Sequence, residues 1–194
     1  MVYIQLKELE KYAKINNIPI MLPDGIEFLT NYIKEHNIKN ILEIGSAIGY
    51  SAIKMALVSS DIHVTTIERD EVRYKEAIKN IDNFKLNNQI DIIYGDALET
   101  NITGNYDLVF IDAAKSQYIR FFEKYKKNLS NNGVIISDNL DFHGLTHEGV
   151  EIKSRNLRQL VKKINKYKIF LENNEEFITE FISIGDGIGI SRRR

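Results

Sequence analysis

The sequence ILEIGSAIGYS, residues 41–51, predicts a buried strand that turns directly into a helix. Three of the four residues 41–44 are apolar and the run stops at Gly45, while residues 50–59 favour a helix. Gly45 and Gly49 can adopt positive φ and let a ligand approach the backbone. The free N–H groups of the first helical turn then point at that ligand. A strand, a glycine turn and a helix N-terminus together predict a binding cradle.

The spacing of these glycines indicates which ligand the cradle holds. A dinucleotide site has G-x-G-x-x-G, and here Ala47 takes the place of the second glycine, which makes a poor pyrophosphate site. The next predicted strand ends in Glu68, about twenty residues past the loop, where an acid can accept hydrogen bonds from ribose hydroxyls. The combination favours a nucleoside without phosphates. The alternative is an α/β turn with two purely structural glycines.

Composition limits the class of protein. With 194 residues and 43% apolar content, the chain is long enough for one well-buried domain spanning 1–194. A net charge of −1 provides no global field that would attract nucleic acid or a membrane. The lack of cysteine excludes disulfides, thiolate zinc sites and cysteine nucleophiles. The charged start and strand-sized apolar runs predict a cytoplasmic protein without a signal peptide or membrane span.

Residues 1–38 precede the predicted sheet. Residues 2–16 carry apolar side chains near helical spacing among Lys and Glu, which predicts an amphipathic helix. Two prolines interrupt this pattern, and a second helix is expected after Asp24, a favourable N-cap. This segment is expected to form a lid over the ligand, a subunit contact or a plain packing layer.

After the cradle the chain alternates between strand-like and helix-like segments. The expected strands are 62–67, 90–94, 107–111 and 133–137, and the expected helices are 71–83, 116–128 and a long one from about 150. Such alternation implies an α/β fold, a parallel sheet with helices on both faces. Residues 177–184 and 188–192 are β-type runs joined at Gly185-Asp186-Gly187, which predicts a hairpin. This arrangement resembles the Rossmann-like seven-stranded methyltransferase sheet, mostly parallel with an antiparallel C-terminal hairpin.

Four predicted strands end in an acid: Glu68, Asp96, Asp112 and Asp138. Ligands of such sheets bind beyond the carboxyl ends of the strands, so we expect these four side chains at one edge. Asp96, in the sequence GDA, is expected to accept a hydrogen bond from a purine amino group. The alternative for Asp96 is an aspartate that stabilises its own turn.

Asp112 and the pair Asp138-Asn139 predict a cation site. Two carboxylates and an amide oxygen are hard ligands that suit Mg²⁺ or a similar divalent cation rather than zinc. Without a cation the two carboxylates would repel each other across a partly buried edge. Lys115 follows Asp112 by three residues, so its ammonium is expected to reach the same place. A helix-capping aspartate with a surface lysine is the alternative for Asp112 taken alone.

The sequences LEIGSAIGYS, FIDAAKSQY, VIISDNL and GDGIGIS resemble the cation-dependent O-methyltransferases that include the catechol and caffeoyl-CoA enzymes. The resemblance runs from about Ile18 to the end of the chain. It implies S-adenosylmethionine and Mg²⁺ or Mn²⁺ as cofactors, and a homodimer. It implies that Asp112, Asp138 and Asn139 hold the metal, and that catalysis rests on Asp112 and on Lys115 as the base. The donor would be held by Met21, Gly45, Ser46, Gly49, Ser51, Glu68, Asp96, Ala97 and Asp112. Many bacterial members have a second acid where this chain has Ala114.

Within the family, the short N-terminus, IPIMLPDG, the AAK variant and the basic ending are similar to bacterial tRNA methyltransferases that act on 5-hydroxyuridine at the wobble position. Basic residues suited to phosphate contacts are Arg155, Arg158, Lys162, Lys163, Lys166, Lys168, Arg192, Arg193 and Arg194. A solvated helix face with a solubilising tail is the alternative reading of these charges. The alternative functions are a catechol-like small-molecule methyltransferase and a non-catalytic nucleoside- or RNA-binding module.

The four histidines offer no metal-ligand set. His143 and His147 lie four residues apart in DFHGLTHEG, which directly follows the predicted metal ligands. We expect this loop to shape the acceptor pocket and neither histidine to act directly.

Overall fold

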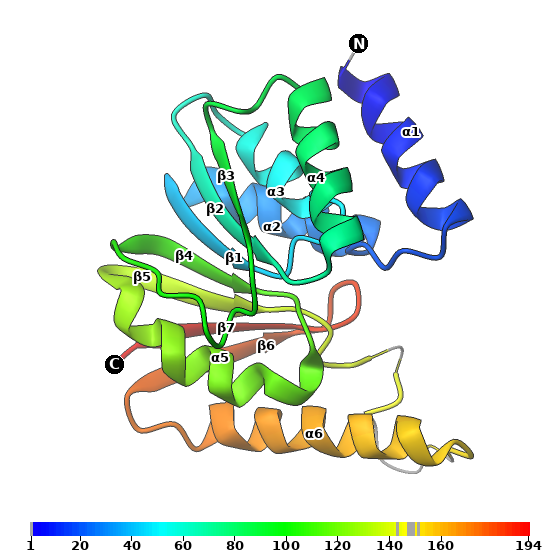
Figure 1. The fold of residues 1–194 in the computed structure, drawn as a ribbon. Helices are drawn as coiled ribbons and strands as arrows, with labels where there is room; N and C mark the ends of the chain where they lie inside the picture. Colours follow the sequence, from blue (N-terminus) through cyan, green and yellow to red (C-terminus); the bar gives the residue numbers. More distant parts are fainter. Residues whose placement is uncertain (1, 143, 147–149, 151) are drawn as a thin grey trace.

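The computed structural model describes residues 2–142, 144–146, 150 and 152–194 (Figure 1). Its centre is a seven-stranded sheet in the order β3-β2-β1-β4-β5-β7-β6. The strands are β1 (Asn40–Ile44), β2 (His63–Glu68), β3 (Ile90–Tyr94), β4 (Tyr106–Ile111), β5 (Leu129–Ser137), β6 (Phe177–Ile182) and β7 (Ile188–Arg193). Strands β1 to β5 pair in parallel, and β7 runs antiparallel between β5 and β6. The predicted sheet with its C-terminal antiparallel hairpin is confirmed.

Helices cover both faces of this sheet. They are α1 (Val2–Ile15), α2 (Pro23–Glu35), α3 (Tyr50–Ala56), α4 (Glu71–Asn83), α5 (Tyr118–Tyr125) and α6 (Arg155–Glu172), with short 3₁₀ turns η1 (Lys115–Gln117) and η2 (Lys126–Asn128). Figure 1 shows α2, α3 and α4 on one face with α1 outermost, and α5 and α6 on the other. In the described part of the chain, no helix has the length and apolar character that crossing a membrane requires.

Alternation along the strands builds a hydrophobic core on each face. Ile41 of β1 packs with α2 and α3, whereas Leu42 and Ile44 pack with α5 and α6. In β4, Phe110 and Val109 divide in the same way between the two cores. Because successive side chains of a strand point to opposite faces, a strand that is apolar throughout must be covered twice. This double burial holds the strand ends in a fixed arrangement.

Two helix starts differ from the sequence prediction. Helix α2 begins at Pro23 with Leu22 as its N-cap, not after Asp24. Proline suits the first helical position because its φ is already helical and its missing N–H has no partner to lose there. Helix α6 begins at Arg155 rather than near residue 150, because Ser154 caps it by accepting a hydrogen bond from the backbone N–H of Leu157.

The extent of two other elements also differs. Strand β5 begins at Leu129, four residues before the predicted start, because Leu129 still pairs with Tyr106 before a register irregularity. Helix α3 ends at Ala56 rather than at residue 59. These shifts change no strand order and move none of the predicted strand-end acids.

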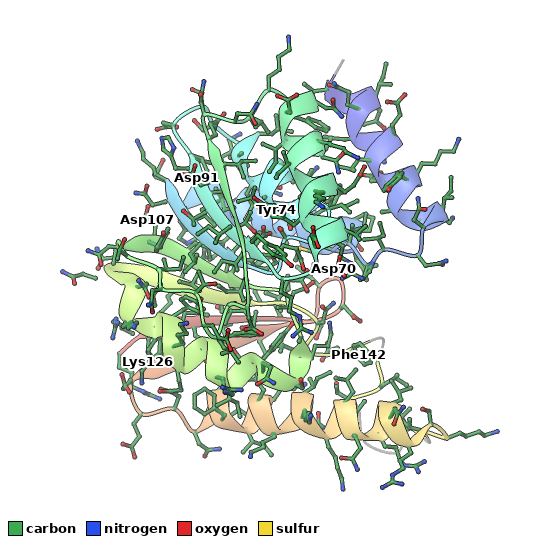
Figure 2. All side chains as sticks on the ribbon, in the orientation of Figure 1. Asp70, Tyr74, Asp91, Asp107, Lys126 and Phe142 are labelled. Carbon is green, nitrogen blue, oxygen red and sulfur yellow. The ribbon has the colours of Figure 1, made fainter. Side chains whose placement is uncertain are left out.

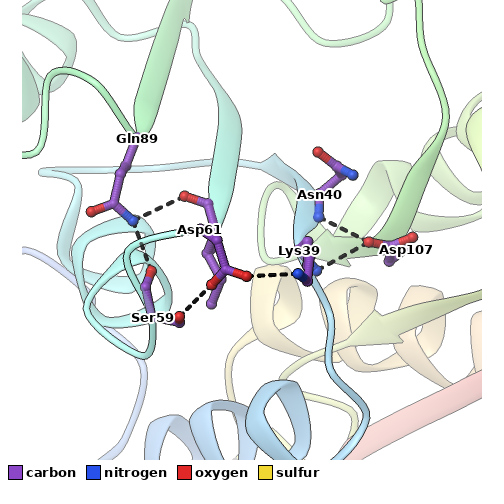
Figure 3. A network of polar contacts seen from close by, with 7 residues as sticks. Lys39, Asn40, Ser59, Asp61, Gln89 and Asp107 are labelled. Atoms are coloured by element: carbon purple, nitrogen blue, oxygen red, sulfur yellow. Dashed lines mark hydrogen bonds and ion pairs between the residues drawn. The ribbon is translucent and has the colours of Figure 1, made fainter.

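A polar network closes the amino ends of the strands (Figure 3). The carboxylate of Asp107 accepts hydrogen bonds from the backbone N–H groups of Lys39 and Asn40, at 3.0 and 2.9 Å. The ammonium of Lys39 pairs with Asp61 at 2.7 Å. The Gln89 amide donates to three backbone carbonyls between α3 and β2. The network therefore satisfies backbone groups at this end of the sheet.

Candidate active site

A cavity of about 420 Å³ opens at the carboxyl ends of the parallel strands. Figure 2 shows Asp107 at one end of the strands, and Asp70 and Phe142 at the other, where the cavity lies. The loops after all five parallel strands contribute to its wall, together with the β6–β7 turn and the segment between α1 and α2. Of the predicted site residues, those that line it are Met21, Gly45, Ser46, Ser51, Glu68, Asp96, Ala97, Asp112, Lys115, Asp138 and Asn139.

Gly45 forms the floor of the cradle. Its φ is 95°, and a Cβ at this position would collide with the backbone oxygen of Asp112. Only glycine therefore allows the β1 and β4 loops to approach each other this closely. The next residue, Ser46, has a buried hydroxyl without a hydrogen-bond partner among the described residues. A buried polar atom without a partner in the wall of a cavity is suited to a ligand.

Gly49 differs from the prediction that it contacts the ligand. It is the N-cap of α3 with φ 81°, but it does not line the cavity. A Cβ on Gly49 would meet the side chain of Ala77 at 3.4 Å, on the side of α4. Its role in the structure is conformational: a left-handed backbone starts α3 and leaves room for α4.

Glu68 joins two loops of the cavity. One of its carboxylate oxygens accepts a hydrogen bond from the backbone N–H of Ala47 at 2.8 Å, and the other accepts one from Asp70, also at 2.8 Å. The residue is 7% exposed, on the cavity side. The two backbone donors fix the orientation of the carboxylate, and each oxygen retains acceptor capacity for a ligand hydroxyl.

Asp96 has a structural role as well as its place in the wall. It accepts a hydrogen bond from the backbone N–H of Leu98 at 2.8 Å, which is the turn-stabilising role named as the alternative. Helix α5 supports this loop, since Lys124 donates to the carbonyls of Leu98 and Thr100 at 2.7 and 2.8 Å. The Tyr125 hydroxyl donates to the carbonyl next to Asp96, that of Ala97, at 2.5 Å.

Glu43 is a buried acid whose role the sequence analysis did not identify. It lies in β1 with no exposed surface, and it accepts hydrogen bonds from the hydroxyls of Ser51 and, at 2.5 Å, Thr66. Burial raises the pKa of Glu43 to about 7. Because Ser51 lines the cavity, Glu43 fixes the orientation of a hydroxyl in the cavity wall. The sequence signal for this role was an acid among the apolar residues 41–44 of a strand that is expected to be buried.

The residues after β4 and β5 meet as predicted for a cation site. Asp138 is buried and Asp112 is half-buried, and desolvation is the main cause that raises the pKa of each carboxyl. The charge of Asp112 raises the pKa of Asp138 further. The ammonium of Lys115 donates to the side-chain oxygen of Asn139 at 2.7 Å and lies 5.4 Å from the ring centre of Phe142. One corner of the cavity therefore contains two carboxyl groups, an amide and an ammonium, from Asp112, Asp138, Asn139 and Lys115.

This corner fits a divalent cation in the chemistry of its donors. The Oδ1 atom of Asp138 is buried and lacks a hydrogen-bond partner among the described residues. No group of three or more His, Cys, Asp or Glu side chains forms a metal site in the described part of the chain. A cation here would therefore take its third protein oxygen from the amide of Asn139, which is a ligand type that Mg²⁺ accepts.

The N-terminal segment packs against the fold and contributes to the cavity wall. Residues 19–22, between α1 and α2, line the cavity, with Met21 buried there. Helix α1 is joined to α4 through Gln5 and to the cradle through Glu10, which accepts a 3.0 Å hydrogen bond from the Tyr50 hydroxyl. Tyr50 also lines the cavity.

The predicted basic residues lie outside the cavity wall. Those exposed on α6 are Arg155, Arg158, Lys162, Lys163 and Lys166. Lys168 pairs with Asp141 at 3.4 Å, and Arg192 donates to the Tyr32 hydroxyl at 3.0 Å. His143 and His147 lie outside the described residues, whereas their neighbour Phe142 lines the cavity.

Comparison with known proteins identifies the family. The model of the O-methyltransferase family matches residues 3–194. A caffeoyl-CoA O-methyltransferase from Populus kitakamiensis is 30% identical, over 97% of this chain and 86% of its own length. A crystal structure from Staphylococcus aureus, assigned as a caffeoyl-CoA O-methyltransferase, is 41% identical with a TM-score of 0.93, over 97% of this chain and 92% of that one.

A further solved relative carries a ligand. The O-methyltransferase from Bacillus cereus, in complex with SAH, is 26% identical with a TM-score of 0.83, over 98% of this chain and 90% of that one. The sheet order, the cavity at the strand ends and these matches agree with one another. The chain therefore belongs to the family of S-adenosylmethionine-dependent O-methyltransferases that includes the caffeoyl-CoA enzymes.

Proposed function

We propose that this protein is a divalent-cation-dependent methyltransferase that converts 5-hydroxyuridine at the tRNA wobble position to 5-methoxyuridine. The observation that carries the cation-dependent chemistry is the hydrogen bond between Lys115 and Asn139 beside the carboxylates of Asp112 and Asp138, in the same cavity as Glu68. Binding of a nucleoside alone requires no such group, so this corner supports an enzyme over a non-catalytic binding module.

The donor would lie along the loops of β1, β2 and β3. Ser46 supplies a hydroxyl without a partner among the described residues, and Glu68 supplies an oriented carboxylate for the ribose hydroxyls. Asp96 and Ala97 would face the purine, and Met21 would cover it from the α1–α2 segment. Methyl transfer from a sulfonium is an in-line displacement, so alignment of donor and acceptor is the main task, worth about 7–11 kcal/mol.

The acceptor oxygen must be ionised before it attacks. Asp112, Asp138 and Asn139 would hold a divalent cation, Mg²⁺ or Mn²⁺. When bound, such a cation acts as a Lewis acid and lowers the pKa of a hydroxyl group bound to it. Beside the positive charge of the cation, Lys115 would more readily lose a proton to solvent, and the resulting neutral amine would take the proton from the acceptor hydroxyl through Nζ, the atom that donates to Asn139 in this structure. An acceptor with two neighbouring oxygens suits this corner, and both 5-hydroxyuracil and a catechol have them.

The charge on α6 supports an RNA acceptor. Arg155, Arg158, Lys162 and Lys166 are spaced by three, four and four residues, so they form one stripe along the helix, about 16 Å from the first Cα to the last. The first turn of α6 contains Arg155 and Arg158 and no acid. The positive end of the helix dipole lies at this turn and disfavours arginine there. A row of exposed cations along α6, with Arg155 and Arg158 in this unfavourable first turn, suits a run of phosphates.

A phenolic small molecule is the second candidate acceptor. The named substrates of relatives support it, since these include caffeoyl-CoA enzymes and a flavonoid 3′,5′-methyltransferase from Vitis vinifera. The same chelating corner serves either acceptor, so the chemistry at Asp112 and Asp138 does not distinguish them.

A homodimer is also part of the proposal. Helix α1 exposes large apolar side chains on its outer surface, with Tyr3, Ile4 and Ile15 between 62% and 71% exposed. A second copy of the chain would cover such a surface. Molar mass in solution, measured by light scattering, tests this part separately.

The test of the function is methyl transfer to tRNA from cells that lack this gene, followed by mass analysis of the nucleosides. A catechol is assayed in parallel with the same preparation and cation. We expect a mass gain of one methyl group on 5-hydroxyuridine. Methylation of the catechol alone would favour the small-molecule enzyme. Thermal stabilisation by S-adenosylmethionine, with none by Mg²⁺ and no transfer to either acceptor, would favour a binding module.

A further inference from the structure

We propose that Asp186, in the turn of the β6–β7 hairpin, is a positioning residue that sets which end of the Asn139 amide faces the cation site. This inference rests on the proposed cation-dependent function, and it adds a residue that lies 47 positions from Asn139 in the chain. It gives the C-terminal hairpin a part in building the site.

The contact itself is directional. The Nδ2 atom of Asn139 donates a 3.2 Å hydrogen bond to Oδ2 of Asp186. An ionised carboxylate only accepts hydrogen bonds, so the amide must present its NH₂ group to Asp186. Its oxygen is then directed to the other side, where it accepts the 2.7 Å hydrogen bond from Lys115. A flipped amide would place its oxygen against the carboxylate of Asp186 and its NH₂ group against an ammonium.

The turn that carries Asp186 is firmly joined to the loop after β5. The backbone oxygen of Asp186 accepts hydrogen bonds from the N–H groups of Asp141 and Phe142, at 2.8 and 3.3 Å. The carbonyl of Gly187 accepts a third, from Leu140, at 2.9 Å. A Cβ on Gly187 would lie 2.6 Å from the backbone nitrogen of Asp141, so only glycine permits this approach.

The backbone of Asn139 is left-handed, a conformation that asparagine adopts more readily than most other residues with a side chain. Its φ is 61°, in the left-handed region that non-glycine residues seldom adopt. Asp186 is 4% exposed, so its carboxylate faces the site and not the solvent. Residues that fix the orientation of metal ligands typically change metal affinity 10–100-fold when they are removed.

Binding of Mn²⁺ to the full chain, measured by calorimetry without acceptor, tests this inference. Asp186→Ala removes the acceptor, and we expect the dissociation constant for Mn²⁺ to rise by roughly 10–100-fold. Asp186→Asn removes the charge but keeps an acceptor oxygen, so we expect it to retain most of the affinity. Asp91→Ala, an exposed aspartate of β3, controls for the loss of one negative charge.

A double-mutant cycle shows whether Asp186 acts through Asn139. In the Asn139→Ala background, Asp186→Ala should cause little further loss, because the amide that it orients is gone. Equal losses in both backgrounds would overturn the inference, since Asp186 would then act by charge alone. Affinity for S-adenosylmethionine checks that each variant is folded, and Asp186→Ser replaces Asp186→Ala if the latter fails this check.

The outcomes for the inference and for the proposed function are distinct. Wild-type protein that binds no Mn²⁺ would overturn both. If the wild-type protein binds Mn²⁺ and Asp186→Ala binds it equally tightly, the role of Asp186 is overturned. The proposed cation site would then remain in place.

Discussion

The Lys115 ammonium and the side-chain oxygen of Asn139 lie 2.7 Å apart, and they bring together the loops after β4 and β5. The two residues are separated by 24 positions, and each comes shortly after an acid that directly follows a strand, Asp112 after β4 and Asp138 after β5. The positive charge of Lys115 partly offsets the effect of burial on the pKa values of Asp112 and Asp138. If Asn139 holds a cation, as proposed above, its oxygen would no longer accept from Nζ of Lys115, so the same amide oxygen serves either the cation or the lysine.

Removal of either predicted cation ligand after β5 should abolish transfer but spare donor binding. Asp138→Ala and Asn139→Ala each remove an oxygen donor, while the donor loops of β1 and β2 stay intact. We expect S-adenosylmethionine affinity within a few-fold of wild type by calorimetry, and no detectable product. Activity that survives EDTA would contradict the cation-dependent mechanism.

Loss of the Glu68 carboxylate should weaken donor binding. Glu68→Ala removes the acceptor for the ribose hydroxyls and also the partner of the Ala47 N–H. Hydrogen bonds to a charged group contribute about 1.5–3 kcal/mol each, so a loss of tenfold or more in affinity is expected. Glu71→Ala, an exposed acid in the first turn of α4, is the matched control. Unchanged affinity for the donor would mean that Glu68 does not contact it.

Glu43 should make stability depend on pH. Its pKa is raised from 4.5 to about 7 in the folded protein, so the folded state binds more protons than the unfolded state between these values. The free energy of unfolding should therefore be highest below the unfolded pKa and fall as pH rises through this window. A pKa difference of this size corresponds to a contribution from Glu43 of at most about 3.4 kcal/mol to the free energy of unfolding.

The Glu43→Gln variant provides the comparison. Glutamine stays neutral, so its free energy of unfolding should fall less steeply over the same window. Some slope should remain, because the pKa values of Asp112 and Asp138 are raised in the same direction. Urea unfolding in EDTA at several pH values measures both proteins. Parallel curves for wild type and Glu43→Gln would show that Glu43 is not the group responsible.

The α6 stripe should matter for RNA and not for a small acceptor. Replacement of its four basic residues with Gln should weaken tRNA binding. The slope of the logarithm of the binding constant against the logarithm of the salt concentration should become shallower by roughly 0.7–0.9 per lost phosphate contact. Transfer to a catechol should survive, because these side chains lie outside the cavity wall. The control replaces four exposed lysines elsewhere, Lys11, Lys14, Lys75 and Lys79. An unchanged salt slope would remove the support for an RNA acceptor.

Much of this protein could be predicted without a structure. The alternation of apolar segments is a local property of the chain, and it determined the parallel sheet, the helices on both faces and the C-terminal hairpin. The strand-end acids could be placed at one edge because parallel strands all present their carboxyl ends there. For this reason the sequence predicted that four residues lie close together, and in the structure all four line one cavity: Asp112, Lys115, Asp138 and Asn139.

Other parts of the site depend on packing between segments that are distant in sequence. Gly49 has the same local signal as Gly45, but its open side faces Ala77 of α4, and Gly49 does not line the cavity. Glu43 and Thr66 meet because two parallel strands pair in one register.

The contact between Asp186 and Asn139 has the same origin, because it exists only once the hairpin turn has been joined to the loop after β5. Sequence periodicity by itself determined which end of each strand carries the chemistry. Only the tertiary structure decided which side chains orient one another there, since those contacts are made between backbones that the sheet and its helices bring together.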